Sequence, residues 1–436
     1  MPVTTPAPAA STAMPSIGFW TAVSLVMGNM IGSGVFLLPS SLARYGGISL
    51  IGWIVSAGGA ILLALVFARL AAVRPASGGP YAYTRAAFGD LAGFLVAWGY
   101  WISAWTANAA LAVAFVGYLS PFVPAVTRRP ASAAALAVMV LWILTALNVH
   151  GIRAVARVQV VTTVLKILPL AFVGIGGLLL LDRSHFAIDD TGLAAVSRAT
   201  ASTATLTLFA FLGLECATIP AASIANPVRT IPRATILGTV CAAVIYIAGT
   251  AGVMGLLRPQ TLEQSAAPFA DAARAIGGEW AGAIVAIGAA ISCFGALNGW
   301  ILIAGQLPMA VARDGLFPRM FGRVSARDTP VRGLVIAGVL STALIAMNYT
   351  RGLVDLFTFI ILLATLSTLL PYAFCSLAGF LIPGGPRPRS RGHLTVAALA
   401  FTYSLCAIGG AGAEVVYWGF LLLVAGLPVY VWVARS

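Results

Sequence analysis

Long apolar runs separated by short polar segments make up almost the whole chain. A helix needs about 20 mostly apolar residues to cross the hydrocarbon core of a bilayer, and twelve segments meet that requirement. The runs are continuous and do not alternate, so they predict helices rather than the strands of a barrel. The predicted spans cover residues 17–42, 47–72, 91–119, 132–149, 157–181, 200–222, 233–256, 280–305, 331–349, 353–381, 394–411 and 415–433.

The composition supports this pattern and excludes two other classes of protein. Of the 436 residues, 60% are hydrophobic and 8% are charged, and the mean hydropathy is +0.98. A soluble domain carries about 25% charged residues, so a soluble multidomain enzyme is excluded. The apolar content also excludes a disordered chain, except for a short tail at 1–16. The sequence therefore predicts an all-α integral membrane protein.

The charges near the span ends predict the orientation. With both termini in the cytoplasm, sixteen arginines fall on the inner side and eight on the outer side, whereas three acidic residues are inner and eight are outer. This is the bias of the positive-inside rule. The net charge of +13 then lies wholly on the inner side, and topology explains it without a nucleic-acid partner. The two charges left over, Lys166 and Glu215, fall inside predicted spans.

Two of the predicted spans contain helix-weakening residues at matching places. The first span has three glycines between Gly28 and Gly34, and each Gly weakens a helix by about 1 kcal/mol relative to Ala. The sixth span has Gly213 followed by Glu215. Interrupted spans in two halves indicate a transporter site at the midplane. The predicted organisation is a single transporter domain over 17–434, with a first repeat at 17–181, an inverted second repeat at 200–381 and two extra helices at 394–433.

The breaks themselves suggest which chemistry they serve. Unwinding at Gly32, Ser33 and Gly34 frees backbone N–H groups that suit a carboxylate. Freed carbonyls in the sixth span suit an ammonium group. Together they favour an α-amino acid as the ligand. Helix packing is the alternative explanation of a glycine cluster.

Glu215 and Lys166 are the candidate coupling residues. A carboxylate or an ammonium buried in a membrane is costly and usually functional. For Glu215 the functions are proton coupling, gating or contact with a cationic substrate, and the alternative is a structural hydrogen bond. For Lys166 they are replacing a coupling cation or carrying a proton, and the alternative is snorkelling to the interface. Asn108 is a further candidate because a lone amide in hydrocarbon needs a partner.

Other reactive residue types form no cluster. The three histidines and five cysteines are scattered and show no metal-type or catalytic spacing, so no metal, cofactor or enzyme is predicted. The polar groups converge on one midplane spot instead of lining a pore, so a channel is disfavoured.

Six motifs, taken together and in order, resemble those of the amino acid–polyamine–organocation superfamily over about residues 17 to 430. Within it, the chain is most similar to the basic amino acid/polyamine antiporters, in particular those that exchange arginine for agmatine. The motifs are GNMIGSGVF at 28–36, SGGPYAY at 77–83, FLGLE at 211–215, NPVRTIPRAT at 226–235, GWILIAGQ at 299–306 and DGLFP at 314–318.

This resemblance implies an inverted-repeat fold, a homodimer, and roles for individual residues. Ser33 and Gly34 would hold the substrate carboxylate, and the carbonyls of Ile31 and Leu212 would hold the α-amino group. Asn108, Phe209, Trp300 and Ala364 would surround the side chain. Trp300 would also be a middle gate. Tyr100, Glu215 and Tyr372 would form an inner gate, with Glu215 as a proton sensor.

The chain departs from the antiporter pattern at three positions. Phe209 replaces a Trp, Ala364 replaces a Ser, and Lys166 replaces a small apolar residue. A lysine at the last position is similar to that of sodium-independent, proton-coupled permeases, where it occupies the place of a sodium ion. The sequence therefore predicts an inner-membrane amino acid transporter, either an arginine/agmatine-type antiporter or a proton-coupled permease for neutral or broad-range amino acids that uses Lys166.

Overall fold

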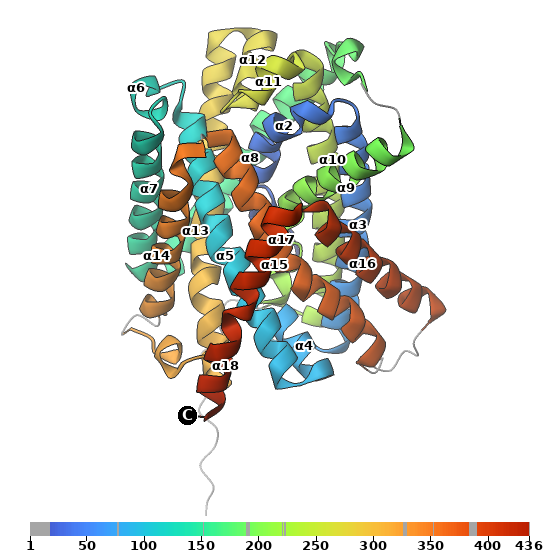
Figure 1. Cartoon of the computed structure of the whole chain (residues 1–436), viewed down its shortest axis with the longest axis vertical. Helices are drawn as coiled ribbons and strands as arrows, with labels where there is room; N and C mark the ends of the chain where they lie inside the picture. Colours follow the sequence, from blue (N-terminus) through green and yellow to red (C-terminus); the bar gives the residue numbers. More distant parts are fainter. Residues whose placement is uncertain are drawn as a thin grey trace, which may run out of the picture.

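The computed structural model describes residues 18–75, 78–150, 152–188, 192–219, 221, 224–325, 329–351, 353–382 and 390–435, without the side chains of 150–161, 163 and 164. The predicted tail at 1–16 lies outside these residues. The described part is helical almost throughout (Figure 1). Eleven helices are long and apolar enough to cross a membrane, and a shorter apolar helix at Leu165–Leu179 belongs to the one remaining span, the fifth in the chain. The prediction of twelve spans is confirmed.

The spans follow the predicted order with shifted ends. Ten of them are built from one main α-helix or from an α-helix that continues into 3-10 turns, and the first and last are each divided into two α-helices. The first span is α1 (Phe19–Met30) with α2 (Ser33–Leu42), and the sixth is α9 (Leu193–Leu208) with η3 (Phe209–Phe211) and η4 (Cys216–Thr218). The others are α3 (Ile48–Val73), α5 (Asp90–Leu119), α7 (Pro130–His150), α8 (Ile152–Leu179), α10 (Pro227–Leu256), α13 (Glu279–Arg313), α14 (Val331–Asn348), α15 (Leu353–Leu381), α16 (Arg391–Gly410), and α17 (Ala413–Val424) with α18 (Gly426–Arg435).

Several boundaries differ from the prediction for physical reasons. Helix α10 begins at Pro227, six residues before the predicted 233, because proline suits the first turn of a helix. Helix α13 continues past 305 to Arg313 and contains Pro308, which neighbouring helices tolerate within a membrane bundle. The sixth span, expected as a broken helix to 222, has 3-10 turns instead of a second α-helix after its break.

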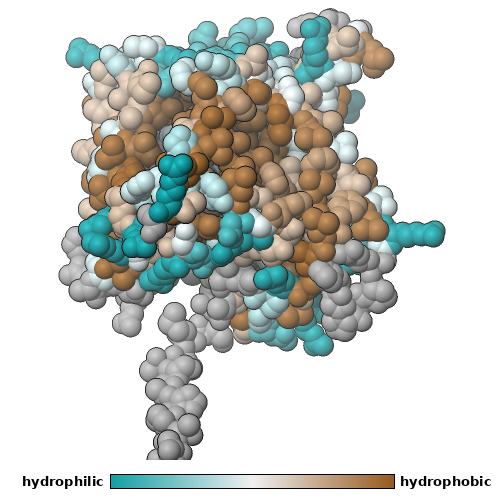
Figure 2. All heavy atoms as spheres, turned by 60° about the horizontal axis from the view of Figure 1, so that its bottom comes forward, coloured by the Kyte–Doolittle hydropathy of each residue, from teal (hydrophilic) through white to brown (hydrophobic). Residues whose placement is uncertain are grey.

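Short helices that the apolar pattern did not predict cover the two ends of the bundle. Figure 1 shows α11 (Pro259–Glu263) and α12 (Pro268–Gly277) at one end, and α4 (Pro80–Phe88) at the other, near the C-terminus. The short α6 (Pro124–Thr127) lies at the same end as α12. In the space-filling view, apolar side chains form a broad area across the middle, with hydrophilic residues at its upper edge and on the lower, forward end (Figure 2).

The ion pairs agree with the predicted division into two faces. Each one among the described residues joins charges that the sequence places on the same side of the membrane. The pairs are Arg85 with Asp90 and Asp314 on the predicted inner side, and Arg44 with Glu263 and Asp355, His185 with Asp182, Arg274 with Asp271 and Glu279, and Arg351 with Glu414 on the predicted outer side.

Helix α5 is the centre of the bundle and is buried along nearly its whole length. It packs against α13 and α15, while α10 packs against α3, α8 and α1. The two interrupted spans meet α5 and α13 in the interior. This arrangement places the candidate site at the middle of the molecule.

Candidate functional site

The break in the first span is short and leaves backbone carbonyls without helical partners. Only Ile31 and Gly32 separate α1 from α2. The Gly32 N–H donates to the Met30 carbonyl at 2.9 Å, so it does not reach the carbonyl of Gly28, as it would in a continuous helix. A buried backbone carbonyl needs another donor.

Three side chains from two other helices supply these donors. The Lys166 Nζ of α8 donates to the Gly28 carbonyl at 2.7 Å. The Trp300 Nε1 of α13 donates to the Asn29 carbonyl at 3.4 Å, and the Ser292 Oγ, also of α13, donates to the Ile31 carbonyl at 3.3 Å. Lys166 is fully buried in the protein, which argues against the alternative that it snorkels to the interface. The break is thus fixed to α8 and α13.

The N-terminus of α2 presents donors for which the described residues supply no partner. The first N–H groups of a helix have no intrahelical acceptor, and no side chain caps α2. The Ser33 Oγ is buried and makes no hydrogen bond among the described residues. A Cβ on Gly34 would lie 2.9 Å from the Ala210 Cα, so only glycine fits there. These donors and the helix dipole form a ready-made site for an anion.

The break in the sixth span is longer and lies directly against the first. After η3 the chain turns at Gly213, whose φ of 107° favours glycine. A Cβ on Gly213 would lie 3.1 Å from the Asn29 Cβ. The carbonyls of Phe209, Phe211 and Gly213 accept N–H groups within the turn, and the Ala210 carbonyl accepts the Tyr246 hydroxyl. No donor to the carbonyl of Leu212 is recorded among the described residues, which leaves it available to a ligand.

A small cavity lies between the two breaks. It has about 10 Å³ of space for the centre of a water-sized sphere, which is room for about one water molecule. Its lining residues are at least nine-tenths buried, so the cavity lies in the interior of the protein. The lining consists of Asn29, Met30, Gly32, Ser33, Gly34, Ala107, Leu111, Phe209, Leu212 and Trp300.

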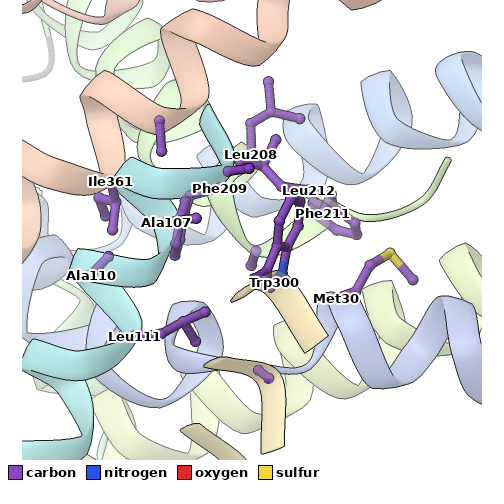
Figure 3. Close-up of a cluster of buried hydrophobic side chains, with 14 of the residues drawn as sticks. Met30, Ala107, Ala110, Leu111, Leu208, Phe209, Phe211, Leu212, Trp300 and Ile361 are labelled. Atoms are coloured by element: carbon purple, nitrogen blue, oxygen red, sulfur yellow. The ribbon is translucent and has the colours of Figure 1, made fainter. Parts of the chain in front are cut away.

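Most of the cavity wall is apolar. Figure 3 shows Phe209, Leu212 and Trp300 close together, with Ala107 and Leu111 of α5 beside them. Acidic side chains are absent from the lining. The ring of Phe209 meets that of Phe357 on α15 edge to face, with 6.1 Å between centroids. The aromatic rings offer faces to an apolar or cationic side chain.

Glu215, in the break of the sixth span, lies between two tyrosines. The Tyr100 hydroxyl of α5 donates to Glu215 Oε1 at 2.5 Å, and the Tyr372 hydroxyl of α15 donates to Oε2 at 2.7 Å. All three side chains are buried. The Tyr100 ring also meets Trp300 edge to face at 6.4 Å. The three proposed inner-gate residues therefore form one contact cluster that joins the sixth span to α5 and α15.

Neither Asn108 nor Ala364 belongs to the cavity lining. Asn108 follows Ala107 on α5, is buried, and has an Oδ1 atom without a hydrogen-bond partner among the described residues. Ala364 is buried on α15, where its carbonyl accepts the Thr368 hydroxyl. Ile31 lies within the first break, and its carbonyl already accepts Ser292.

The structure adds residues that the sequence analysis did not select. Asn29, Met30, Ala107 and Leu111 line the cavity, and Ser292 holds the first break. Asn29 belongs to the glycine-rich motif at 28–36, so the sequence offered a signal that could have selected it as a site residue. The apolar residues of α5 and the serine of α13 carry no signal of their own, because only the packing brings them to the breaks.

A polar cluster lies around α4, at the predicted inner end of the molecule. On α4, Arg85 pairs with Asp90 at 2.7 Å and with Asp314 at 3.2 Å. The Tyr81 hydroxyl donates to Asp314 at 2.8 Å. Burial and the bond to the Asp314 carboxylate raise the pKa of Tyr81 above its ordinary value. This cluster fixes α4 to the start of α5 and the end of α13. Among the residues that the structure describes, no three His, Cys, Asp or Glu side chains are grouped to hold a metal ion.

Comparison with known proteins identifies the family of this fold and site. The model of the amino acid permease family matches residues 17–425. The chain belongs to the amino acid permease family. It is 35% identical to the cadaverine/lysine antiporter of Escherichia coli (strain K12) over 406 residues, which cover 91% of this chain and 90% of that protein.

Two further relatives cover nearly the full length of the chain. A putative arginine/ornithine antiporter of Bacillus subtilis (strain 168) is 33% identical, over 96% of this chain and 97% of that protein. The putrescine transporter PotE of Escherichia coli (strain K12) is 31% identical, over 93% of each. The resemblance to basic amino acid/polyamine antiporters is thereby confirmed, and the protein is a multi-pass membrane transporter and not an enzyme.

Proposed function

We propose that this amino acid permease exchanges a basic amino acid for its decarboxylated amine by alternating access, with arginine and agmatine as the first pair to test. The observation that carries the proposal is the unpartnered set of donors at the start of α2, beside an aromatic cavity. The two interrupted spans meet there, and the residues that line the cavity are buried.

The backbone of the two breaks would bind the amino acid end of the substrate. The N–H groups at Ser33 and Gly34 and the Ser33 hydroxyl would donate to the carboxylate. The carbonyls of Ile31 and Leu212 would accept from the ammonium group. An amine product lacks the carboxylate, so it would use only the acceptors.

The side chain of the substrate would lie between Phe209 and Trp300, whose faces attract a cation. The Oδ1 of Asn108 is buried without a partner and would accept a hydrogen bond from the cationic end. Ala364 offers no polar group, so Asn108 is the polar anchor that remains from the expected set.

Glu215 and the two tyrosines would close the route to the inner side. Opening that route requires both hydroxyls to leave the carboxylate, so the protonation state of Glu215 would couple pH to gate opening. The relatives are named for lysine, cadaverine, arginine, ornithine and putrescine, and these substrates support a basic amino acid or amine.

Counterflow in proteoliposomes tests the proposal. Vesicles loaded with unlabelled agmatine, lysine, cadaverine, ornithine or putrescine are presented with labelled arginine or labelled lysine. We expect uptake of a basic amino acid to be accelerated at least tenfold by one loaded amine. Uptake of equal rate into empty and loaded vesicles would overturn the antiport proposal, and exchange of lysine for cadaverine alone would overturn the arginine/agmatine assignment.

The bond from Lys166 to Gly28 favours a second candidate, a proton-coupled permease for neutral or broad-range amino acids. The protonation state of the buried Lys166 amine on α8 would affect its bond to Gly28, and so the shape of the site. In that case an inward proton gradient drives uptake into empty vesicles, and Lys166→Met abolishes its pH dependence. Unchanged pH dependence in Lys166→Met contradicts this candidate.

We also propose that both termini lie in the cytoplasm and that the protein is a homodimer in a bacterial inner membrane. The charge distribution supports the orientation. Labelling of a cysteine introduced on α4 from one side only, and the mass of the purified protein in detergent, test the two statements.

A further inference from the structure

Arg44 links three elements at the predicted outer end of the molecule. It lies in η1 (Ala43–Tyr45), directly after α2. Its Nε is 3.5 Å from Glu263 Oε1, in the last residue of α11, and its Nη2 is 3.9 Å from Asp355 Oδ1, in the first turn of α15. One guanidinium therefore joins the outer end of the first span to α11 and to α15.

Two further contacts follow the same seam toward the cavity. The Ser41 and Thr358 hydroxyls bond at 2.7 Å between α2 and α15, and the Ser40 hydroxyl donates to the Ser265 carbonyl at 2.7 Å. Further in, the Phe357 ring of α15 meets the Phe209 ring at the cavity. The seam that α2 forms with α15 and with the segment between α11 and α12 is thus closed by successive contacts, and the Arg44 pairs are the farthest from the start of α2.

Helix α2 connects this seam to the candidate site. It has ten residues, about 15 Å of α-helix. Its first turn carries the unpartnered donors of the site, and Arg44 follows its last turn. A displacement of Arg44 would therefore be transmitted along α2 to these donors.

We infer that Arg44 is an electrostatic latch that holds the outer mouth of the transporter closed by pairing with Glu263 and Asp355. It is a positioning residue, because it acts on the site through α2 and does not touch the cavity. The inference rests on alternating access in the proposed function, but not on which substrate is carried. Because Arg44 and Glu263 are about half exposed and Asp355 is 69% exposed, the latch is weak and sensitive to salt.

The distance across the mouth is the direct measurement. Spin labels at Thr261 on α11 and at Thr350 before α15, both exposed, report the closed and open populations in full-length protein in nanodiscs. The partly and fully exposed cysteines, Cys241 and Cys406, are replaced by serine. Arg44→Gln should raise the open population about two- to fivefold, the effect of losing an exposed ion pair. Raising the salt from about 0.01 M to about 1 M should do the same in the parent protein but not in Arg44→Gln.

Charge reversal and rescue separate the latch from a general loss of stability. Arg44→Glu should open the mouth further than Arg44→Gln, and Arg44→Glu combined with Glu263→Arg should restore at least half of the closed population. Arg198→Ala is the matched control, since it removes an outer arginine whose recorded contact is a backbone carbonyl of its own helix. An unchanged distance distribution in Arg44→Gln, or no rescue by the double variant, overturns the inference. If basic amino acids are not exchanged but the distance across the mouth still responds to Arg44→Gln and to salt, only the proposed function is overturned.

Discussion

The two interrupted spans break in different ways. The first loses helical structure over two residues, Ile31 and Gly32, and the carbonyls of this break are held by Lys166, Trp300 and Ser292 from other helices. In the sixth, the residues that the structure describes between Leu208 and Pro227 form no α-helix. Most of its carbonyls are satisfied by its own tight turns.

The charges at the two breaks differ in the same way. The cation at the first break, Lys166, comes from α8, whereas the anion at the sixth, Glu215, belongs to the break itself and is held by Tyr100 and Tyr372. The first break, the proposed binding surface, is therefore fixed by side chains of distant helices. The sixth break forms tight turns of its own, and its carboxylate is held by the hydroxyls of Tyr100 and Tyr372 from other helices, an arrangement that suits the proposed gate.

The largest expected effect comes from filling the contact between the breaks. In Gly34→Ala the new Cβ would lie 2.9 Å from the backbone of Ala210. Overpacking of this kind costs about 1–3 kcal/mol. The affinity for arginine should fall by about one to two orders of magnitude. This loss should be larger than the loss of affinity for agmatine, because agmatine has no carboxylate. Binding to purified protein measures both.

Gly58→Ala is the matched control, because a Cβ at Gly58 meets nothing within 4 Å. It should leave both affinities unchanged. An equal loss for arginine and agmatine in Gly34→Ala would mean that the position serves only packing.

The gate side of the comparison is tested at Glu215. In Glu215→Gln, one of the two tyrosine hydroxyls faces an amide nitrogen and loses its acceptor. Hydrogen bonds to a charged group contribute about 1.5–3 kcal/mol, so the inner route should open at least tenfold more often, and the pH dependence of exchange should flatten. Exchange rates in proteoliposomes between about pH 5 and pH 8 measure this.

Tyr372→Phe removes one of these two bonds from the tyrosine side. If the two groups act through one bond, the double variant should be no worse than the worse single variant. Strictly additive effects would contradict a gate built on that bond.

The fixed side of the comparison is tested at Lys166. Lys166→Met leaves the buried Gly28 carbonyl without its donor, which costs about 1–3 kcal/mol. The melting temperature of the purified protein should fall, and the substrate should restore less of it than in the parent. Ser292→Ala, which removes a neutral donor from the same break, should have the smaller effect, about 1 kcal/mol. A larger loss in Ser292→Ala would contradict a special role for the lysine.

The comparison also explains what the sequence predicts. Both breaks carry local signals, in the glycines between Gly28 and Gly34 and in Gly213 with Glu215, and the prediction found both. The order of the spans follows from apolar length alone. The partners of the freed carbonyls do not, because Lys166 is more than a hundred residues from Gly28, at a sequence separation of 138.

The same argument applies to the cavity wall and to the ends of the bundle. Leu111 and Ala107 have no feature that separates them from other apolar residues of α5. The helices α4, α11 and α12 are too short or too polar for a search based on span length. Packing of distant segments decides these features, and a single sequence carries no direct record of it.

The smallest expected effect concerns the aromatic wall that the two breaks share. Phe209 extends the sixth break over the cavity, and Trp attracts a cation more strongly than Phe through its larger ring face. Phe209→Trp should tighten binding of arginine or lysine by about two- to fivefold, because an added cation–π contribution at a site of this kind is about 0.5–1 kcal/mol. Binding of a neutral amino acid of similar length, such as norleucine, should be unchanged or weaker, since the added ring must fit against Phe357. Equal tightening for the neutral and the cationic ligand would assign the effect to packing alone, and a preference for the neutral ligand in the parent protein would favour the permease over the antiporter.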